Sequence, residues 1–151
     1  MYKKILVGTC LTDYCSHIFN FALNMARENG ASLWIYHGLG RLNTTQAGVE
    51  EKIKAAEARV AEAYVGRMKE QGFTDYMINV SDGDVVSEMA KLARNAGIEA
   101  IVMGTSTETP IAAGESVKVG SLGDVATEIS LWSPCPVIWV PPALIPGLAR
   151  G

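Results

Sequence analysis

The stretch that decides the fold is Ala100–Val140, which has the sequence AIVMGTSTETPIAAGESVKVGSLGDVATEISLWSPCPVIWV. A short apolar run ends at Gly104, a polar loop of fifteen residues follows, a helical pattern opens at Gly120 and Ser121, and a second apolar run closes the stretch. A strand, a glycine-bearing loop and a helix N-terminus in series place free backbone N–H groups and the positive end of a helix dipole at one spot. Such a spot favours an anion, most often phosphate.

Outside this stretch, short apolar runs alternate with longer segments of helical periodicity. The patterns predict strands over residues 4–9, 32–37, 74–80, 100–104 and 135–140, and helices over residues 12–29, 46–71, 84–97 and 121–132. The run Leu33–Tyr36 lacks polar alternation, which is typical of a parallel strand covered on both faces. Strict alternation of strands and helices predicts an α/β fold, with a parallel sheet, helices on both faces and right-handed crossovers.

Ligands of such sheets lie beyond the carboxyl ends of the strands, where the strand order reverses. This rule places Gly8–Cys10, His37–Gly40 and Met103–Ser121 around one crevice. We expect a single domain over residues 1–142, followed by a loose C-terminal tail over residues 143–151.

The apolar spacing also predicts which helix faces are buried. Thr12 is expected to cap the first helix, and Ser121 the fourth, with Asp124 three residues further on as in a capping box. The predicted inward residues are Ile18, Phe21, Ala22 and Met25 in the first helix, Val49, Ile53, Ala56, Val60, Ala63 and Met68 in the second, and Val86, Met89, Ala90 and Ala93 in the third.

Composition excludes several classes of function. With 48% hydrophobic and 19% charged residues the chain has the composition of an ordinary globular protein. The net charge of −3 provides no basic footprint for nucleic acid. The apolar run after Lys3 and Lys4 stops at Gly8, which is too short for a signal peptide or a membrane span. We therefore expect a cytoplasmic protein that contacts neither nucleic acid nor membrane.

Cysteine and histidine residues give no catalytic or metal pattern. Cys10, Cys15 and Cys135 are an odd number at no recognised disulfide spacing, so we expect reduced thiols. Together with His17 and His37 they match no zinc spacing. At the crevice, Cys10 is either a redox-sensitive thiol or a small buried one, and the buried role is the commoner.

Several short motifs follow one another in a specific order along almost the whole chain. They are Lys3–Val7 (KKILV), Gly83–Asp84, Ile101–Gly104 (IVMG), Gly120–Ser121 and Ser133–Val140 (SPCPVIWV). Together they resemble a universal stress protein. The resemblance implies the adenine nucleotide alpha hydrolase-like fold, an open sheet of five parallel strands in the order 3-2-1-4-5.

Members of this family that bind ATP carry a glycine, two residues, a second glycine, nine residues, and then Gly-Ser or Gly-Thr. Glycines let the backbone approach phosphate oxygens, and the final pair starts a helix whose N–H groups and hydroxyl complete the cradle. Gly104 matches the first glycine and Gly120–Ser121 the final pair. Thr107 stands where the second glycine is expected, and twelve residues rather than nine separate it from Gly120.

The resemblance implies a role for each matching residue. Backbone N–H groups would come from Gly104, Gly120 and Leu122, a hydroxyl from Ser121, and a cation from Lys118, with Thr107 as a phosphate neighbour. Gly8, Thr9, Cys10, Gly38 and Met103 would border the adenine and ribose. Where ATP binders of the family carry an Asp after the first strand, this chain has Cys10. Lys118 is the only cation of a loop that also holds Glu108 and Glu115, so a triphosphate there favours a compensating divalent metal ion.

The last predicted strand lies at a sheet edge in this order, where unpaired backbone groups invite another chain. Similar family members dimerise by pairing this strand antiparallel with its own copy. The residues concerned here are Val137, Ile138, Trp139 and Val140. The resemblance therefore implies a two-fold homodimer.

Two functional hypotheses remain open from the sequence. One is a stress protein that binds ATP or another adenine nucleotide through the loop between Gly104 and Ser121. The other is a nucleotide-free, dimeric regulatory or scaffold stress protein. We expect at most slow ATP hydrolysis as an enzymatic activity. His37 is the only histidine at the crevice, and neither a Ser-His-Asp order nor paired carboxylates accompany it.

Overall fold

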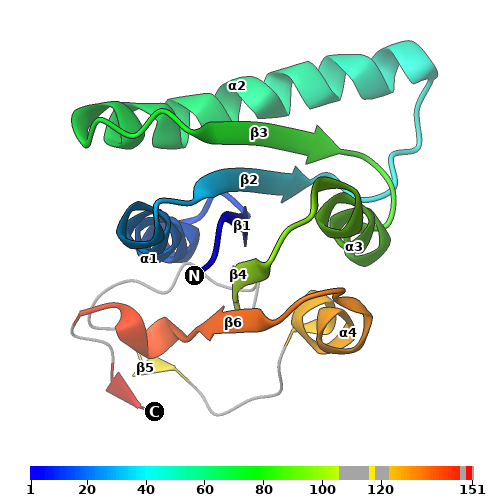
Figure 1. Cartoon of the computed structure of the whole chain (residues 1–151). Helices are drawn as coiled ribbons and strands as arrows, with labels where there is room; N and C mark the ends of the chain where they lie inside the picture. Colours follow the sequence, from blue (N-terminus) through cyan, green and yellow to red (C-terminus); the bar gives the residue numbers. More distant parts are fainter. Residues whose placement is uncertain (106–115, 118–122, 147–148, 151) are drawn as a thin grey trace.

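Five parallel strands form one open sheet in the order β3-β2-β1-β4-β6 (Figure 1). The strands are β1 (Lys4–Gly8), β2 (Ser32–Gly38), β3 (Tyr76–Ser81), β4 (Ala100–Gly104) and β6 (Val137–Val140). The computed structural model describes residues 1–105, 116–117, 123–146 and 149–150. The predicted α/β fold and strand order 3-2-1-4-5 are confirmed, with β6 as the fifth strand of the sheet.

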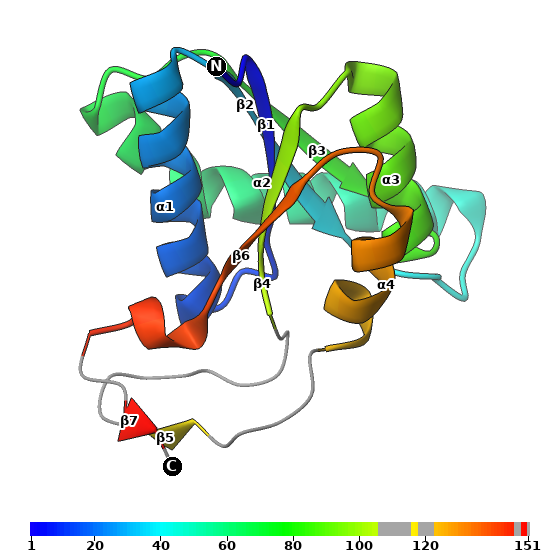
Figure 2. The same ribbon diagram turned by 60° about the horizontal axis from the view of Figure 1, so that its bottom comes forward.

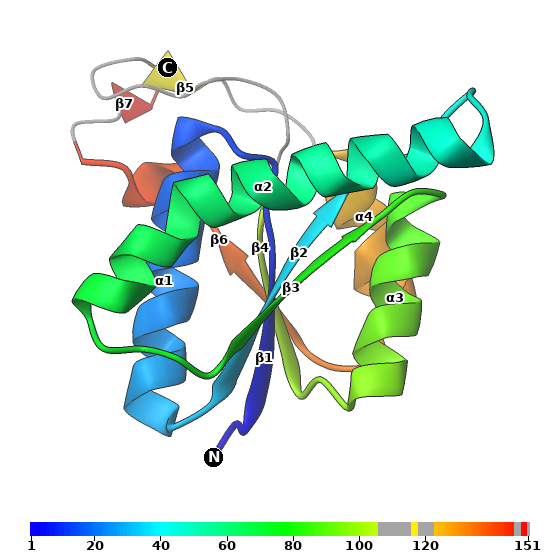
Figure 3. The same ribbon diagram turned by 90° about the horizontal axis from the view of Figure 1, so that it is seen from above.

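Four helices cover the two faces of the sheet. They are α1 (Asp13–Asn29), α2 (Gln46–Glu70), α3 (Val85–Ala96) and α4 (Asp124–Trp132). Figure 3 shows α1 on one side of the sheet and α3 and α4 on the other. One apolar cluster packs beneath α1 and α2, and a second packs beneath α3 and α4. No helix within the described residues combines the length and the apolar character needed to cross a membrane.

Residues of β1 show why the central strands have no polar alternation. Ile5 and Val7 belong to the cluster beneath α1 and α2, whereas Leu6 belongs to the cluster on the opposite face. All three side chains are fully buried. Successive side chains of a strand point to opposite faces, so a strand with helices on both sides must be apolar at every position.

Helix boundaries follow their capping residues closely. The Thr12 side chain accepts a hydrogen bond from the Cys15 N–H, and Thr45 caps α2 in the same way through the Gly48 N–H. Gly30 ends α1 in the left-handed region, at φ 63°. The sequence therefore predicted α1 and α2 to within a residue or two at each end.

The predicted inner faces are correct in α3 and partly wrong in α1. Val86, Met89, Ala90 and Ala93 of α3 are all buried. In α1, however, Phe21 is 38% exposed, and the buried aromatic residues are Tyr14 and Phe19. The buried face runs through Tyr14, Cys15, Ile18, Phe19, Ala22, Leu23 and Ala26, in alternating steps of one and three. That face is wider than the single row assumed from Phe21 and Met25.

Helix α4 begins later than predicted. Its first residue is Asp124 and its N-cap is Gly123, so the expected capping box of Ser121 with Asp124 is wrong. The Gly123 N–H donates to the Thr105 carbonyl oxygen (2.9 Å), which fixes the start of α4 beside the end of β4. Ser121 itself lies outside the described residues.

The chain after β6 packs back onto α1. A short 3-10 turn, Pro142–Leu144, is followed by Ile145, which is 4% exposed and belongs to the apolar cluster beneath α1 and α2. Figure 2 shows this turn beside the first turns of α1. The tail is therefore anchored at Ile145 rather than loose from residue 143. Near the C-terminus, β7 (Ala149–Arg150) pairs in parallel with β5 (Ser116–Val117), outside the main sheet.

Candidate functional site

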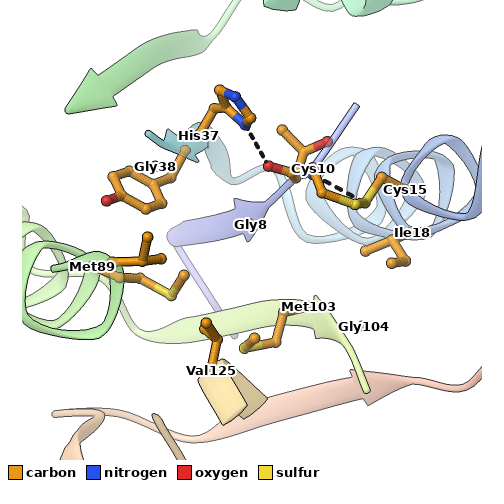
Figure 4. A pocket seen from close by; sticks show the side chains of 13 residues that line it. Gly8, Cys10, Cys15, Ile18, His37, Gly38, Met89, Met103, Gly104 and Val125 are labelled. Carbon is orange, nitrogen blue, oxygen red and sulfur yellow. Dashed lines mark hydrogen bonds between the residues drawn. A yellow bond between two sulfur atoms is a disulfide. The ribbon is translucent and has the colours of Figure 1, made fainter. Parts of the chain in front are cut away.

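A cavity of about 140 Å³ opens at the carboxyl ends of β1, β2 and β4. The strands contribute Gly8, Thr9 and Cys10, then Tyr36, His37 and Gly38, then Met103 and Gly104, and the helices contribute Cys15, Ile18, Val85, Met89 and Val125 (Figure 4). Strand order reverses between β1 and β4, so this is the position where open α/β sheets bind ligands. The lining is mainly apolar, with a few polar groups at one end.

Thr9 is the centre of the polar end. Its backbone N–H donates to the Tyr36 carbonyl oxygen (2.9 Å), and its carbonyl oxygen lies 2.8 Å from His37 Nδ1 (Figure 4). Because a carbonyl oxygen only accepts, the hydrogen of that bond is on Nδ1. These contacts hold the ends of β1 and β2 together and fix the orientation of the imidazole ring.

The Thr9 hydroxyl connects the cavity to α2. It is hydrogen-bonded to the Tyr64 hydroxyl, and the Tyr64 ring stacks on Phe19 at a centroid distance of 4.1 Å. Burial raises the pKa of the Tyr64 phenol, and the Thr9 hydrogen bond opposes that shift. The Thr9 side chain is thus anchored to α2 through Tyr64, which in turn packs on α1 through Phe19.

On the opposite wall of the cavity, Tyr36 lies near the negatively charged carboxylates of Glu88 and Asp84. Burial raises the pKa of Tyr36, whose hydroxyl is 2.9 Å from the Ser81 hydroxyl oxygen, and the carboxylates of Glu88 and Asp84 raise it further. The Ser87 backbone N–H in turn holds the pKa of Asp84 below its ordinary value. Apart from His37, none of the described residues that line the cavity is basic. This arrangement suits a flat, uncharged group better than a bare anion.

Gly38 and Gly104 are required by close packing in the cavity wall. A Cβ atom on Gly38 would lie 2.9 Å from Val85 Cγ2, and one on Gly104 would lie 2.7 Å from Ile18 Cδ1 and 2.9 Å from the Tyr14 ring. The Tyr14 hydroxyl accepts from the Thr105 N–H (3.0 Å) and donates to the Val140 carbonyl oxygen. Gly104 therefore has a packing role beneath Tyr14, which the sequence pattern alone did not reveal.

A disulfide joins Cys10 and Cys15 in the cavity wall, with their Cα atoms 5.9 Å apart. The expectation of three reduced thiols is therefore wrong for this pair, and only Cys135 is free. Spacing along the chain was misleading because the turn after β1 folds back onto the first turn of α1. That turn brings the two Cα atoms within the range that a disulfide spans.

The structure brings six of the predicted nucleotide-site residues together. Gly8, Thr9, Cys10, Gly38, Met103 and Gly104 all line the cavity. The remaining five, Thr107, Lys118, Gly120, Ser121 and Leu122, lie outside the described residues. No group of three or more His, Cys, Asp or Glu side chains that could hold a metal ion occurs in the described part of the chain.

A known protein family matches almost the whole chain. A model of the universal stress protein family matches residues 1–141. The chain belongs to the universal stress protein family. A search of curated protein sequences gave no match.

Solved structures of this family have the same fold. A family member from Burkholderia pseudomallei is 23% identical with a TM-score of 0.69, and the match covers 93% of this chain and 96% of that one. A universal stress protein in complex with cAMP is 24% identical (TM-score 0.69, covering 92% and 97%). A family protein from Arabidopsis thaliana with AMP bound is 17% identical (TM-score 0.60, covering 92% and 91%). At these identities the likeness establishes the fold.

Sequence reasoning missed most of the helical lining. Cys15, Ile18, Val85, Met89 and Val125 all lie within the first two turns of α1, α3 and α4. A usable signal was present, because the first turn of each helix that follows a strand must lie at the carboxyl edge of a parallel sheet. Val85 and Val125 each stand within two residues of a helix start.

Proposed function

We propose that this universal stress protein binds an adenine nucleotide, with the base and ribose in the cavity at the ends of β1, β2 and β4. The observation that carries the proposal is the lining itself: a mostly apolar cavity with the polar groups of Thr9, Tyr36 and His37 among them. Such a site buries a flat base on its apolar walls and uses a few polar atoms to select it. Family structures with cAMP and AMP bound support the same ligand class.

The phosphates are proposed to extend toward the start of α4. Gly123 has no side chain with which to cap α4, so it leaves the first-turn amides of that helix available to an anion. The roles proposed for Thr107, Lys118, Gly120, Ser121 and Leu122 belong to this end of the ligand. ATP is the expected nucleotide, and a divalent metal ion would offset its charge beside Asp84 and Glu88.

The first test is whether nucleotide accompanies the protein. Acid extraction of freshly purified chain, followed by chromatography of the supernatant with detection at the adenine absorbance band, should release adenine nucleotide. Calorimetric titration with adenosine, AMP, ADP and ATP then separates the base from the phosphates. Micromolar affinity for AMP or ATP supports the proposal. An empty cavity that binds none of the four overturns it and favours the alternative, a regulatory or scaffold protein without nucleotide.

A matched pair of variants locates the ligand. Val125→Phe fills the cavity from α4, and we expect it to weaken adenosine binding at least about tenfold, equivalent to about 1.4 kcal/mol. Thr127→Phe adds the same ring on an exposed position of the same helix and should change the affinity less than about twofold. Equal losses in the two variants would contradict this location.

We further propose a two-fold homodimer formed by the free edge of β6. Only β4 pairs with β6 among the described strands, and Val137, Ile138 and Trp139 remain half-exposed there. The neighbouring end of α4 adds Leu131 and Trp132, which are 80% and 67% exposed. Exposed apolar side chains beside an unpaired strand edge favour pairing with another chain.

A further inference from the structure

The cavity wall contains chemistry that nucleotide binding does not require. Cys10 follows β1, Cys15 lies in the first turn of α1, and their disulfide lines the cavity (Figure 4). We propose that this pair is a reversible redox site, reduced by a small thiol that attacks Cys10, and that its oxidation state sets the ligand affinity of the cavity. The second half of this inference rests on the proposed nucleotide function, whereas the first half does not.

The two sulfur atoms are unequal in access. Cys10 is half-exposed, whereas Cys15 is 4% exposed beneath it. A thiolate that arrives from the cavity therefore meets Cys10 Sγ, and Cys15 becomes the leaving group. Exchange depends on which sulfur is accessible and on how well the departing thiolate is stabilised.

Cys15 is placed to leave as a thiolate. The Cys10 backbone N–H donates to Cys15 Sγ at 3.0 Å, and this bond strengthens when the sulfur carries a negative charge. Cys15 is also the third residue of α1, where the positive end of the helix dipole stabilises a negative charge. The nearby carboxylate of Asp13 is exposed, so water screens its opposing charge.

Reduction of the Cys10–Cys15 disulfide consumes two small thiols. The first thiolate forms a mixed disulfide with Cys10 and releases the Cys15 thiolate, which takes up a proton. A second thiolate attacks the small-molecule sulfur of that mixed disulfide, releases the Cys10 thiolate, and forms the free small disulfide. Two electrons pass from the thiols to the protein, and both cysteines end as thiols. The reverse reaction needs only the small disulfide as oxidant.

Reduction would release a constrained turn at the cavity. Leu11, between Cys10 and the Thr12 cap, has φ 61°, which a bulky residue rarely adopts. The turn is held by the disulfide, by the Thr12 cap and by the Leu11 N–H, which donates to Thr9 Oγ1 (3.3 Å). Without the covalent link the turn can relax, and Thr9, which orients His37, relaxes with it. The oxidised form is thus preorganised for ligand.

The first experiment tests the redox site without any nucleotide. The full chain is equilibrated in buffers of varied glutathione to glutathione disulfide ratio, quenched with acid and alkylated, and the number of labels is read by mass. We expect one label, on Cys135, in oxidising buffers and three in reducing buffers, with a reversible midpoint between them. Three labels at every ratio, or one label at every ratio, would overturn the proposal.

Variants assign the transition to the pair. Cys135→Ser should retain the same midpoint and lose one label throughout. Cys15→Ser should abolish the two-label step and leave a mixed disulfide with glutathione on the accessible Cys10. Glutathione found on Cys10 but never displaced, in the chain with both cysteines intact, would also count against a reversible pair.

The second experiment measures coupling. Adenosine and AMP affinities are determined for the oxidised and reduced Cys135→Ser chain, and the oxidised form should bind at least about fivefold more tightly. Linkage then requires that saturating AMP shift the glutathione midpoint toward the oxidised form by the same factor. Equal affinities overturn the coupling. Binding by neither form overturns the proposed nucleotide function, while the labelling result still decides the redox site.

Discussion

Gly104 illustrates how one residue type can satisfy two constraints at once. Its position at the end of β4 matches a family pattern for nucleotide binding, but its missing side chain also makes room for the Tyr14 ring, which hydrogen-bonds to both Thr105 and Val140. Sequence spacing revealed only the first role, because Tyr14 is ninety residues away along the chain.

Gly104→Ala tests the packing role. The new Cβ would lie 2.7 Å from Ile18 Cδ1 and 2.9 Å from Tyr14, so we expect a loss of about 1–3 kcal/mol in the free energy of unfolding. Gly66→Ala is the matched control in α2, where nothing lies within 4 Å and the higher helix propensity of alanine should add about 0.5–1 kcal/mol. Urea unfolding measures both. Equal stability of the two variants would contradict this packing role.

Tyr64 gives a pH-dependent prediction. Its pKa is raised above 10.0 in the folded chain, mainly by burial, so the folded state binds the phenolic proton more tightly than the unfolded state does. The stability that follows is fully present below pH 10 and is lost as the pH rises above that value. In urea unfolding between pH 8 and pH 11, wild type should therefore lose more stability than Tyr64→Phe. If wild type and Tyr64→Phe lost stability equally over this pH range, the Tyr64 pKa would be the same in the folded and unfolded chain, and the prediction would be wrong.

Elements were predicted from the sequence where capping residues and apolar period agreed. β4 was predicted at its exact bounds, and α2 to within one residue, because its apolar residues recur with helical period from Val49 to Met68. The end of α4 was predicted correctly, but its start was misplaced by three residues, since Ser121 and Asp124 imitate a capping box while the Gly123 N–H is already bonded to Thr105. The disulfide was missed for a similar reason: it depends on the left-handed turn at Leu11, which local propensity disfavours.

The start of α2 offers a test at the scale of an element. Thr45 Oγ1 accepts from the Gly48 N–H at 3.1 Å, and removal of an N-cap of this kind typically costs about 1 kcal/mol. Thr45→Ala should lower the free energy of unfolding by that amount, whereas Thr45→Ser keeps the acceptor oxygen and should remain close to wild type. A Thr45→Ser chain as unstable as Thr45→Ala would attribute the loss to side-chain packing instead.

At the scale of the whole molecule, the sheet has two edges of different character. β3 lies at one edge beside α2, whereas β6 lies at the other with apolar, half-exposed residues (Figure 1). The Pro136 carbonyl oxygen accepts from the Ile101 N–H, so alternate residues of β6 face β4 and the residues between them, Val137 and Trp139, turn their backbone groups outward. This outward edge is the proposed dimer interface.

Val137→Pro tests the dimer. Sedimentation velocity at micromolar concentration should give wild type twice the 16.2 kDa mass of the chain. Val137→Pro removes an outward N–H and should shift the protein toward the monomer, with at least about a tenfold weaker dimer. Val137→Ala loses the side chain but keeps the N–H, and it should remain dimeric. A wild-type monomer under these conditions would refute the proposed homodimer.

The bond between the Gly123 N–H and the Thr105 carbonyl oxygen has a consequence for how this chain can vary. It ties the end of β4 to the start of α4, so the placement of these two elements does not depend on the length of the segment between them. The three extra residues relative to the family pattern therefore need no compensating change elsewhere in the sheet. Segments of other lengths can therefore be grafted between the same two anchors without changing the scaffold.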